Sequence, residues 1–267
     1  MQKTILITGS TDGIGLETAR RLVSLGQHVL LHGRNPSKLD EVEKTLATLP
    51  RDGRVESYQA DLSDLANVEA LARAIMDKYL KLDVLINNAG VYSAPHIATP
   101  DGLDIRFAVN TVAPYLLTKR LLPLLSTSGR VINLSSAAQS PVDPKALTGQ
   151  VSLSDDFTAY AQSKLALTMW SHSLALSLES DAPAIIAVNP GSMLGSKMVK
   201  QAFGVAGSDI GIGADILRRA ALTDEFATAS GKYFDNDKGQ FASPHPDALD
   251  LQKSQEVVRL IETILAK

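Results

Sequence analysis

The sequence predicts an α/β fold, in which a doubly wound parallel sheet of about seven strands is flanked by helices on both faces. Three observations support this prediction. Short runs of aliphatic or β-branched residues recur along the chain, amphipathic segments separate them, and most of these runs are apolar almost throughout. Strands that are buried on both faces have this composition, and parallel strands need a crossover segment, usually a helix, between them.

The expected strands follow one another along the whole chain. They are Lys3–Thr8, His28–Gly33, Arg54–Gln59, Leu82–Asn88, Gly129–Ser136, Ala184–Pro190 and a shorter run at Lys232–Phe234. No repeat, low-complexity tract or glycine/serine linker divides the chain. We therefore expect residues 1–267 to form one domain.

The segments between the strands have helical periodicity. From Gly15 to Leu25 apolar residues recur every three or four positions, and Gly26 ends the segment. The last segment, Leu251–Leu265, is also amphipathic. We expect it to pack against the rest of the domain, and a helix lying on a membrane surface is the alternative.

The composition excludes several classes of function. A net charge of −3 leaves no basic field for nucleic acid or anionic lipid. Without cysteine there is no disulfide or thiolate site, and the five histidines lack metal-ligand spacing, so we expect no metal. No apolar stretch approaches the roughly 18 residues of a membrane span. We expect no signal peptide, no anchor, no membrane partner and a cytoplasmic location.

A glycine-rich turn joins the first expected strand to the first expected helix. Glycines in this setting let the backbone approach a pyrophosphate, and the free N–H groups of the helix attract its charge. This is the Rossmann arrangement for a dinucleotide. The residues expected to hold the cofactor here are Gly9, Ser10, Thr11, Asp12, Gly13, Ile14 and Gly15.

The end of the second expected strand favours NADP(H) over NAD(H). NAD sites usually have an acidic residue there for the ribose hydroxyls, whereas this chain has Arg34, whose planar fork suits a 2′-phosphate. After the third strand, Asp61 and Leu62 are placed to meet the adenine. Asp61 has an alternative interpretation as the N-cap of the following helix.

Candidate catalytic residues follow several of the expected strands. Tyr160 and Lys164 are four residues apart and therefore share one helix face, where an ammonium lowers the pKa of a phenol. Upstream are Asn110 and the pair Ser135 and Ser136. The run Asn88, Ala89 and Gly90 ends the fourth strand.

Two irregular stretches also follow strands. Ligands of open parallel sheets bind beyond the carboxyl ends of the strands. We therefore expect both stretches to shape the substrate pocket. They are Pro141–Asp156, in a loop near residues 137–158, and Ser192–Ile212, in a loop near residues 192–213.

The chain resembles the short-chain dehydrogenase/reductase family over nearly its whole length. The resemblance lies in the order of the glycine motif, Asn-Asn-Ala-Gly, Asn110, Ser136 and the Tyr-x-x-x-Lys motif. The resemblance implies that Tyr160 exchanges a proton with the substrate oxygen and that Lys164 lowers the pKa of Tyr160 and grips the nicotinamide ribose. It further implies that Ser136, the second serine of its pair, bonds the substrate oxygen and that Asn110 holds a water of a proton relay. Asn88 to Gly90 would line the cofactor channel, with Asn88 mainly structural.

The turn after the sixth strand also matches the family. Pro190 and Gly191 resemble the turn beside the nicotinamide amide, but Gly195 replaces the usual threonine. Ser196 is the candidate substitute. The insert before Tyr160 and the run Gly231–Phe234 resemble the retinol-dehydrogenase-like branch, which often takes apolar or bulky carbonyl substrates.

The resemblance implies an NADP(H)-dependent oxidoreductase that acts on a small-molecule carbonyl or alcohol. It also implies a homodimer or homotetramer formed through the helix of Tyr160 and the helix before it. Two alternatives remain. An epimerase or dehydratase uses the same tyrosine and lysine but usually has a different glycine spacing and a longer chain. A catalytically idle NADP-binding sensor or scaffold would have no need of Ser136, Tyr160 and Lys164.

Overall fold

Strands alternate with helices along the chain, as the hydrophobic pattern predicts. The computed structural model describes residues 2–49, 52–179 and 182–267. Its strands are β1 (Thr4–Ile7), β2 (His28–Gly33), β3 (Arg54–Gln59), β4 (Leu82–Asn87), β5 (Leu125–Leu134), β6 (Ala184–Asn189), β7 (Tyr233–Asp235) and β8 (Gln240–Ala242). The predicted strand positions are confirmed, with ends that differ by up to four residues.

Within the described ranges, all eight strands form one sheet in the order β3-β2-β1-β4-β5-β6-β7-β8. The pairs from β3 through β7 are parallel, and β8 pairs with β7 in the antiparallel sense. The prediction of about seven parallel strands is confirmed. The sequence pattern missed β8, because this strand has only three residues and one large apolar side chain, Phe241, and so has no apolar run that would indicate a strand.

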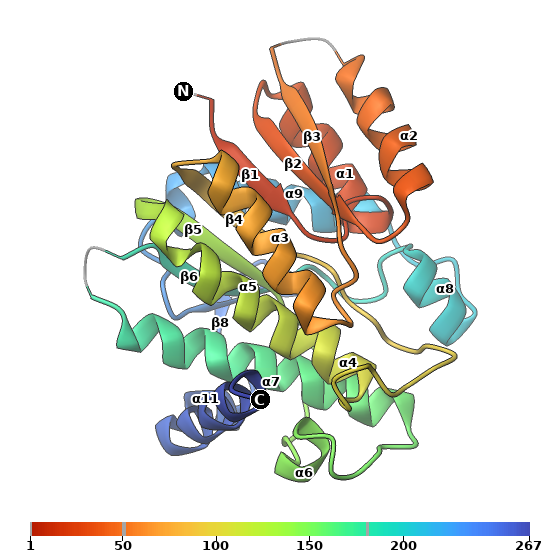
Figure 1. Ribbon diagram of the computed structural model, residues 1–267, viewed down its shortest axis with the longest axis vertical. Coiled ribbons are helices and arrows are strands. Elements are labelled where there is room, and N and C mark those ends of the chain that lie inside the picture. The colour runs from red at the N-terminus through yellow and green to blue at the C-terminus, as the bar shows by residue number, and fades with distance from the viewer. Residues whose placement is uncertain (1, 50–51, 180–181) are drawn as a thin grey trace.

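Helices cover both faces of the sheet (Figure 1). They are α1 (Gly13–Ser24), α2 (Pro36–Ala47), α3 (Leu65–Lys78), α4 (Ile105–Phe107), α5 (Ala113–Leu121), α6 (Pro144–Leu147), α7 (Asp156–Ser177), α8 (Lys197–Phe203), α9 (Ile210–Leu222), α10 (Pro246–Leu249) and α11 (Leu251–Leu265). Short 3-10 turns lie at Leu122–Leu124 and Asp224–Phe226, and a π-helical turn lies at Ala108–Val112.

Alternation along the strands creates two hydrophobic cores. In β1, Leu6 belongs to the core that includes residues of α3, α5, α7 and α11, whereas Ile5 and Ile7 belong to the core that includes residues of α1, α2 and α9. Successive side chains of a strand point to opposite faces, so both faces of a central strand are buried in apolar contact. This burial explains why the central strands read as continuous apolar runs.

The first helix starts earlier than its apolar pattern suggests. Helix α1 begins at Gly13, because the Asp12 side chain accepts a hydrogen bond from the Gly13 N–H and caps the helix. At the other end Gly26 adopts a φ of +79°, so its role as the stop is confirmed. Leu25, which the pattern assigns to the buried face, is 41% exposed because the helix has already ended.

The C-terminal helix packs as predicted. Val257, Ile261 and Ile264 of α11 are buried against the core that includes α7. The fully buried Trp170 of α7 meets Tyr115 of α5 edge to face, with ring centroids 5.4 Å apart. The faces of α5 and α7 that we expected to form a subunit contact therefore lie partly beneath the chain's own α11. None of the helices in the described ranges combines the length and apolar character of a membrane span.

Candidate active site

The glycine turn lies where the strand order reverses. Strand β1 is bordered by β2 on one side and β4 on the other, so the segments that leave the carboxyl ends of β1 and β4 lead to opposite sides of the sheet. This switch point is where open α/β sheets bind ligands. Three segments of the predicted site meet here: the turn from Gly9 to Gly15, the end of β2 and the Asn88–Gly90 run.

A histidine at the end of β2 holds the glycine turn in place. The Gly9 N–H donates to His32 Nδ1 at 3.1 Å, and His32 Nε2 lies 3.1 Å from the Ala60 carbonyl oxygen. Ser10 adds three contacts, since its N–H and its hydroxyl donate to the His32 carbonyl at 2.9 and 3.3 Å and its Oγ accepts from the His32 N–H at 2.9 Å. Burial lowers the pKa of His32 to about 4, so the ring is neutral at pH 7 and Nδ1 is free to accept.

Two of the glycines are required by close backbone contacts. A Cβ on Gly9, whose φ is +64°, would lie 2.9 Å from Ala89 Cα. A Cβ on Gly15 would lie 2.3 Å from the Gly9 carbonyl oxygen. Within the described residues the N–H groups of Ile14 and Gly15 at the start of α1 find no acceptor. The turn therefore has the free donors and open backbone that a pyrophosphate needs.

Asn88 ties β4 to the same turn. Its Nδ2 donates to the carbonyl oxygens of Thr8 at 2.8 Å and Gly9 at 3.0 Å. The Thr8 hydroxyl accepts in turn from the N–H groups of Asn88 and Ala89, both at 3.0 Å. The expectation that Asn88 is mainly structural agrees with these contacts. Gly90, next along the chain, faces Lys164, since a Cβ there would lie 3.5 Å from Lys164 Nζ.

The residues expected to select and hold the adenosine lie at the ends of β2 and β3. Arg34 is exposed directly after β2. Asp61 accepts from the N–H and hydroxyl of Ser63 at 3.0 and 2.7 Å, while Leu62 is buried. The alternative role of Asp61 as an N-cap is wrong, because Asp64 caps α3 by accepting from the Ala66 N–H.

Tyr160, Ser136 and Lys164 converge beyond the ends of β5 and β6. Tyr160 and Lys164 come from α7, and the Ser136 side chain lies close enough to the Tyr160 phenol to lower its pKa. Lys164 is buried, its Nζ donates to the Leu134 carbonyl at 2.7 Å and it lies 5.7 Å from the centre of the Tyr160 ring. A phenol, a hydroxyl and an ammonium thus lie close together at this edge of the sheet.

The pKa values of this group reflect loss of solvent. Burial raises the pKa of Tyr160, and the hydrogen bond from Ser136 acts in the opposite direction. Burial also lowers the pKa of Lys164 to about 8. We expected Lys164 to lower the pKa of Tyr160. Here burial has the largest effect on the Tyr160 pKa, and the Lys164 ammonium donates to a backbone carbonyl instead.

Ser135 and Ser136 have different surroundings. Ser135 is buried, and its hydroxyl lies 2.6 Å from Thr168 Oγ1. Ser136 is partly buried and faces Tyr160. The structure therefore places Ser136, the residue selected from the sequence, at the candidate site, and it gives Ser135 a packing position.

Asn110 lies in the π-helical turn Ala108–Val112 that precedes α5. Its Oδ1 accepts from the Val91 N–H at 2.8 Å, and its Nδ2 donates to the Val91 carbonyl at 2.8 Å and to Ser163 Oγ at 2.9 Å. The side chain therefore joins the loop after β4 to α7. π-turns inside helices often mark functional sites. The predicted role of Asn110 in a proton relay stays a prediction.

A hairpin that the sequence pattern missed supports the turn after β6. Asp237, between β7 and β8, accepts from the Ser192 N–H at 2.8 Å, the Ser192 hydroxyl at 2.5 Å and Asn189 Nδ2 at 2.9 Å. Asn236 Nδ2 donates to the Pro190 carbonyl at 2.9 Å. The predicted Pro190–Gly191 turn is thereby held from outside. Ser196, the candidate for the missing threonine, uses its hydroxyl to cap α8.

The stretch Ser192–Ile212 connects the candidate site to the glycine helix. It contains α8, whose Phe203 packs on Tyr92, and the Tyr92 ring in turn lies 5.3 Å from that of Tyr160. It ends in α9, which packs closely on α1: a Cβ on Gly213 would lie 3.3 Å from Cδ1 of Ile14 in α1.

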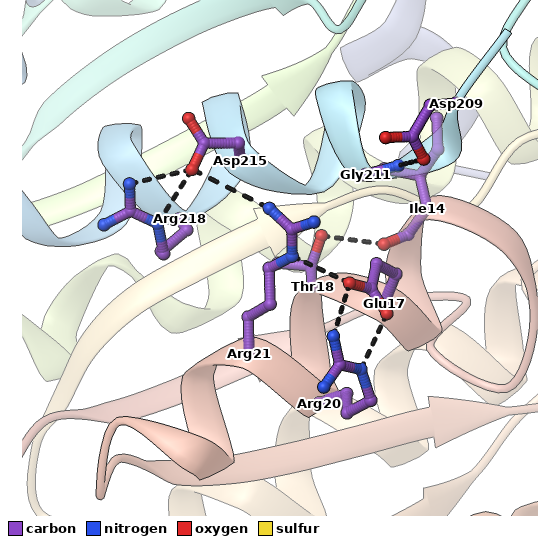
Figure 2. Close-up of polar contacts among 9 residues, drawn as sticks. All are labelled: Ile14, Glu17, Thr18, Arg20, Arg21, Asp209, Gly211, Asp215 and Arg218. Atoms are coloured by element: carbon purple, nitrogen blue, oxygen red, sulfur yellow. Dashed lines mark hydrogen bonds and ion pairs between the residues drawn. The ribbon is translucent and has the colours of Figure 1, made fainter.

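Charged side chains link the two helices, as Figure 2 shows. Arg21 of α1 donates to Glu17 at 2.8 Å and lies 3.7 Å from Asp215 of α9, which also accepts from Arg218 at 2.8 Å. The predicted substrate segment is thus attached to the helix that would carry the phosphates.

The stretch Pro141–Asp156 is held by a buried arginine. Arg106 donates through Nε and Nη2 to the Asp104 carboxylate at 2.8 and 2.6 Å. It also donates to the Leu153 carbonyl at 3.0 Å and pairs with Asp156 at the start of α7. Because Arg106 is 1% exposed, this cluster fixes the insert to the helix that bears Tyr160.

A family model described as short chain dehydrogenase matches residues 3–206. This chain belongs to the short-chain dehydrogenase/reductase family. Retinol dehydrogenase 13 of Mus musculus is 31% identical over 99% of this chain and 83% of its own length, which places the chain in the retinol-dehydrogenase-like branch. Human polyprenol dehydrogenase is 35% identical over 71% of this chain and 60% of its own length.

Solved structures agree with this family assignment. A putative uncharacterized protein from Mycobacterium paratuberculosis superposes with a TM-score of 0.82 at 28% identity, over 98% of this chain and 93% of its own. An angucycline C-6 ketoreductase with bound NADP superposes with a TM-score of 0.69 at 26% identity, over 88% of this chain and 93% of its own. The family and these neighbours support an oxidoreductase that uses a nicotinamide cofactor and a small-molecule substrate.

Sequence reasoning missed His32, Tyr92 and Asp237. Each contacts a residue that is distant in the sequence. His32 bonds Gly9, Tyr92 packs on Tyr160, and Asp237 bonds Ser192. No local spacing signals such pairs, although the position of His32 one residue before Gly33 at a strand end is a usable hint. Among the described residues no cluster of His, Asp and Glu could hold a metal.

Proposed function

We propose that this chain is an NADP(H)-dependent oxidoreductase that transfers a hydride between the nicotinamide and a carbonyl/alcohol substrate, with Tyr160 as general acid/base. The observation that carries the proposal is the convergence of the Tyr160 phenol, the Ser136 hydroxyl and the Lys164 ammonium at the carboxyl edge of the sheet. A rotating hydroxyl and a phenol together can donate to one substrate oxygen.

The residues at the switch point fit a dinucleotide. The free N–H groups of α1 and the glycine turn suit the pyrophosphate, Arg34 suits a 2′-phosphate, and Asp61 with Leu62 would border the adenine. Lys164 would hold the nicotinamide ribose, while Ala89, Gly90, Pro190 and Gly191 would border the nicotinamide side. The bound cofactor supplies or accepts the hydride.

The chain's own residues handle the proton. In the reductive direction the carbonyl carbon gains the hydride, and Tyr160 gives its proton to the carbonyl oxygen as negative charge develops there. The raised pKa of Tyr160 keeps the phenol protonated at neutral pH, which suits a donor. Ser136 stabilises the same oxygen, and the Lys164 ammonium stabilises the phenolate that remains.

The pH dependence of reduction is expected to follow Lys164. Because the Lys164 pKa is about 8, its ammonium is present below that pH and lost above it. We expect kcat for reduction to fall as pH rises through about 8. Lys164→Met should lower kcat by about 10²–10³-fold and abolish this fall. Rate profiles over pH check this, and an identical midpoint in Lys164→Met would contradict the assignment.

The His32 bridge yields a prediction about cofactor affinity. His32→Leu removes the acceptor of the Gly9 N–H and the donor to the Ala60 carbonyl, so the turn loses its support. We expect NADPH to bind roughly five- to tenfold more weakly, the equivalent of about one hydrogen bond. Fluorescence titration measures this dissociation constant. His172→Leu, which removes a histidine bonded to Gly231 away from the turn, should leave it unchanged.

His32 is also expected to make the free energy of unfolding depend on pH in the acid range. Its folded pKa of about 4 lies below the ordinary value of 6.5, so the neutral ring stabilises the fold above pH 6.5. That contribution is lost as pH falls from 6.5 towards 4. The parent should therefore lose more unfolding free energy over this window than His32→Leu does, and parallel pH profiles would contradict the role.

The main alternative is a catalytically idle NADP-binding sensor. It shares the cofactor-binding residues and differs only in turnover, so the decisive experiment is to measure NADPH oxidation with carbonyl substrates. Binding without turnover would favour the sensor.

A further inference from the structure

The glycine turn contains a carboxylate at a place proposed to bind an anion. Asp12 was expected to contact the cofactor, but the structure gives its two oxygens other partners. Oδ1 accepts from the Gly13 N–H at 2.8 Å, and Oδ2 accepts from Lys38 Nζ at 2.7 Å. The hydrogen bond from Lys38 lowers the pKa of Asp12, so this carboxylate is ionised at neutral pH.

Lys38 and Asp12 bridge the turn and the end of β2. Lys38 lies in the first turn of α2, where its N–H donates to Asn35 Oδ1 at 3.0 Å. On the other side Thr11 packs on Gly33, since a Cβ there would lie 2.6 Å from Thr11 Cγ2. The ion pair therefore borders the end of β2, where this fold reads the 2′ position of the ribose.

The charged side chains around the end of β2 carry a net positive charge. Arg34 and Lys38 are cationic and Asp12 is anionic, so the three side chains carry a net charge of about +1. Without Lys38 these side chains would carry no net charge, and Asp12 would lose its hydrogen-bonded counter-ion and keep only the more distant charge of Lys197, which also lowers its pKa. Asp12 and Lys38 are 56% and 43% exposed, so both can meet a bound group.

We propose that Lys38 is a second specificity-determining residue for the 2′-phosphate of NADP(H), beside Arg34, and that Asp12 opposes the preference they create. Lys38 neutralises Asp12 and adds a cation to the phosphate subsite, while Asp12 caps α1 at the cost of some affinity for the phosphate. The inference rests on the proposed function, because it concerns the discrimination of NADP(H) from NAD(H).

The experiment is a calorimetric titration of the purified chain with NADP⁺ and, separately, with NAD⁺. Lys38→Gln should weaken NADP⁺ binding by about tenfold and change NAD⁺ binding by less than about twofold, because only NADP⁺ carries the extra phosphate. Asp12→Asn should tighten NADP⁺ binding several-fold, and Asn still caps α1. The double variant should return close to the parent.

Lys44→Gln is the matched control. Lys44 lies on the same helix and pairs with Asp40 at 2.6 Å on an exposed face, so its loss should leave both dissociation constants unchanged. The proposal is overturned if Lys38→Gln weakens both nucleotides equally, or if it behaves like Lys44→Gln. A parent that binds NAD⁺ as tightly as NADP⁺ would instead refute the proposed NADP preference. A parent that prefers NADP⁺ without any loss in Lys38→Gln refutes only the role of Lys38.

Discussion

Tyr160→Phe is expected to lower kcat for carbonyl reduction by at least about 10³-fold while NADPH binding stays within about twofold of the parent. The substitution keeps the ring that packs on Tyr92, with centroids 5.3 Å apart, and removes only the hydroxyl. One positioned donor is typically worth about 10²–10³ in rate. Tyr160 is proposed to supply both a donor and the transferred proton, so the loss should exceed that range.

Tyr115→Phe is the matched control for this prediction. It removes a buried tyrosine hydroxyl as well, but that hydroxyl bonds Glu262 on α11, away from Ser136 and Lys164. We expect its kcat to stay close to that of the parent. Steady-state rates and fluorescence titration of NADPH measure the two quantities. Unchanged turnover in Tyr160→Phe would contradict the proposed chemistry.

Arg106→Leu is expected to lower the free energy of unfolding by about 3–5 kcal/mol, the usual result of removing one partner from a buried ion pair. Arg106 and Asp104 have side chains that are 1% and 5% exposed. The substitution leaves the Asp104 carboxylate without its counter-ion and the Leu153 carbonyl without its donor. Chemical denaturation with linear extrapolation measures the change.

Arg120→Leu is the control for Arg106. Arg120 also makes a double contact with a carboxylate, that of Glu69 at 2.6–2.9 Å, but the side chains are 52% and 33% exposed. Exposed pairs contribute about 0–1 kcal/mol, so this variant should lose little stability. Equal losses in the two variants would contradict the view that burial makes the Arg106 cluster important.

The fold was largely predictable because burial dictates the composition of the central strands. All six residues of β2 are buried, and its predicted bounds agree with the structure. Strand β8 was missed because Gln240–Ala242 is short and partly exposed, and it is defined by pairing with β7 rather than by its own pattern. Likewise nothing local indicates that Asn110 lies in a π-turn or that its side chain bonds Val91 and Ser163.

The candidate site was predictable where its chemistry depends on neighbours in the sequence. Tyr160 and Lys164 share a helix face by spacing alone, and the glycine turn follows from its place between a strand and a helix. Contacts between distant segments were not predictable. The pairing of Asp12 with Lys38 and the support of Gly9 by His32 join residues more than twenty positions apart. The burial that raises the pKa of Tyr160 likewise depends on the residues that surround it in the fold.

The most direct test of the central claim is the rate of NADPH oxidation by the parent chain, followed by nicotinamide absorbance, with a panel of aldehydes, ketones, quinones and retinoids and with NADH in parallel. The proposed function predicts turnover of at least one carbonyl class, with NADPH preferred over NADH. Silence across the panel by a chain that binds NADPH would contradict the claim that it catalyses carbonyl reduction and would favour the sensor.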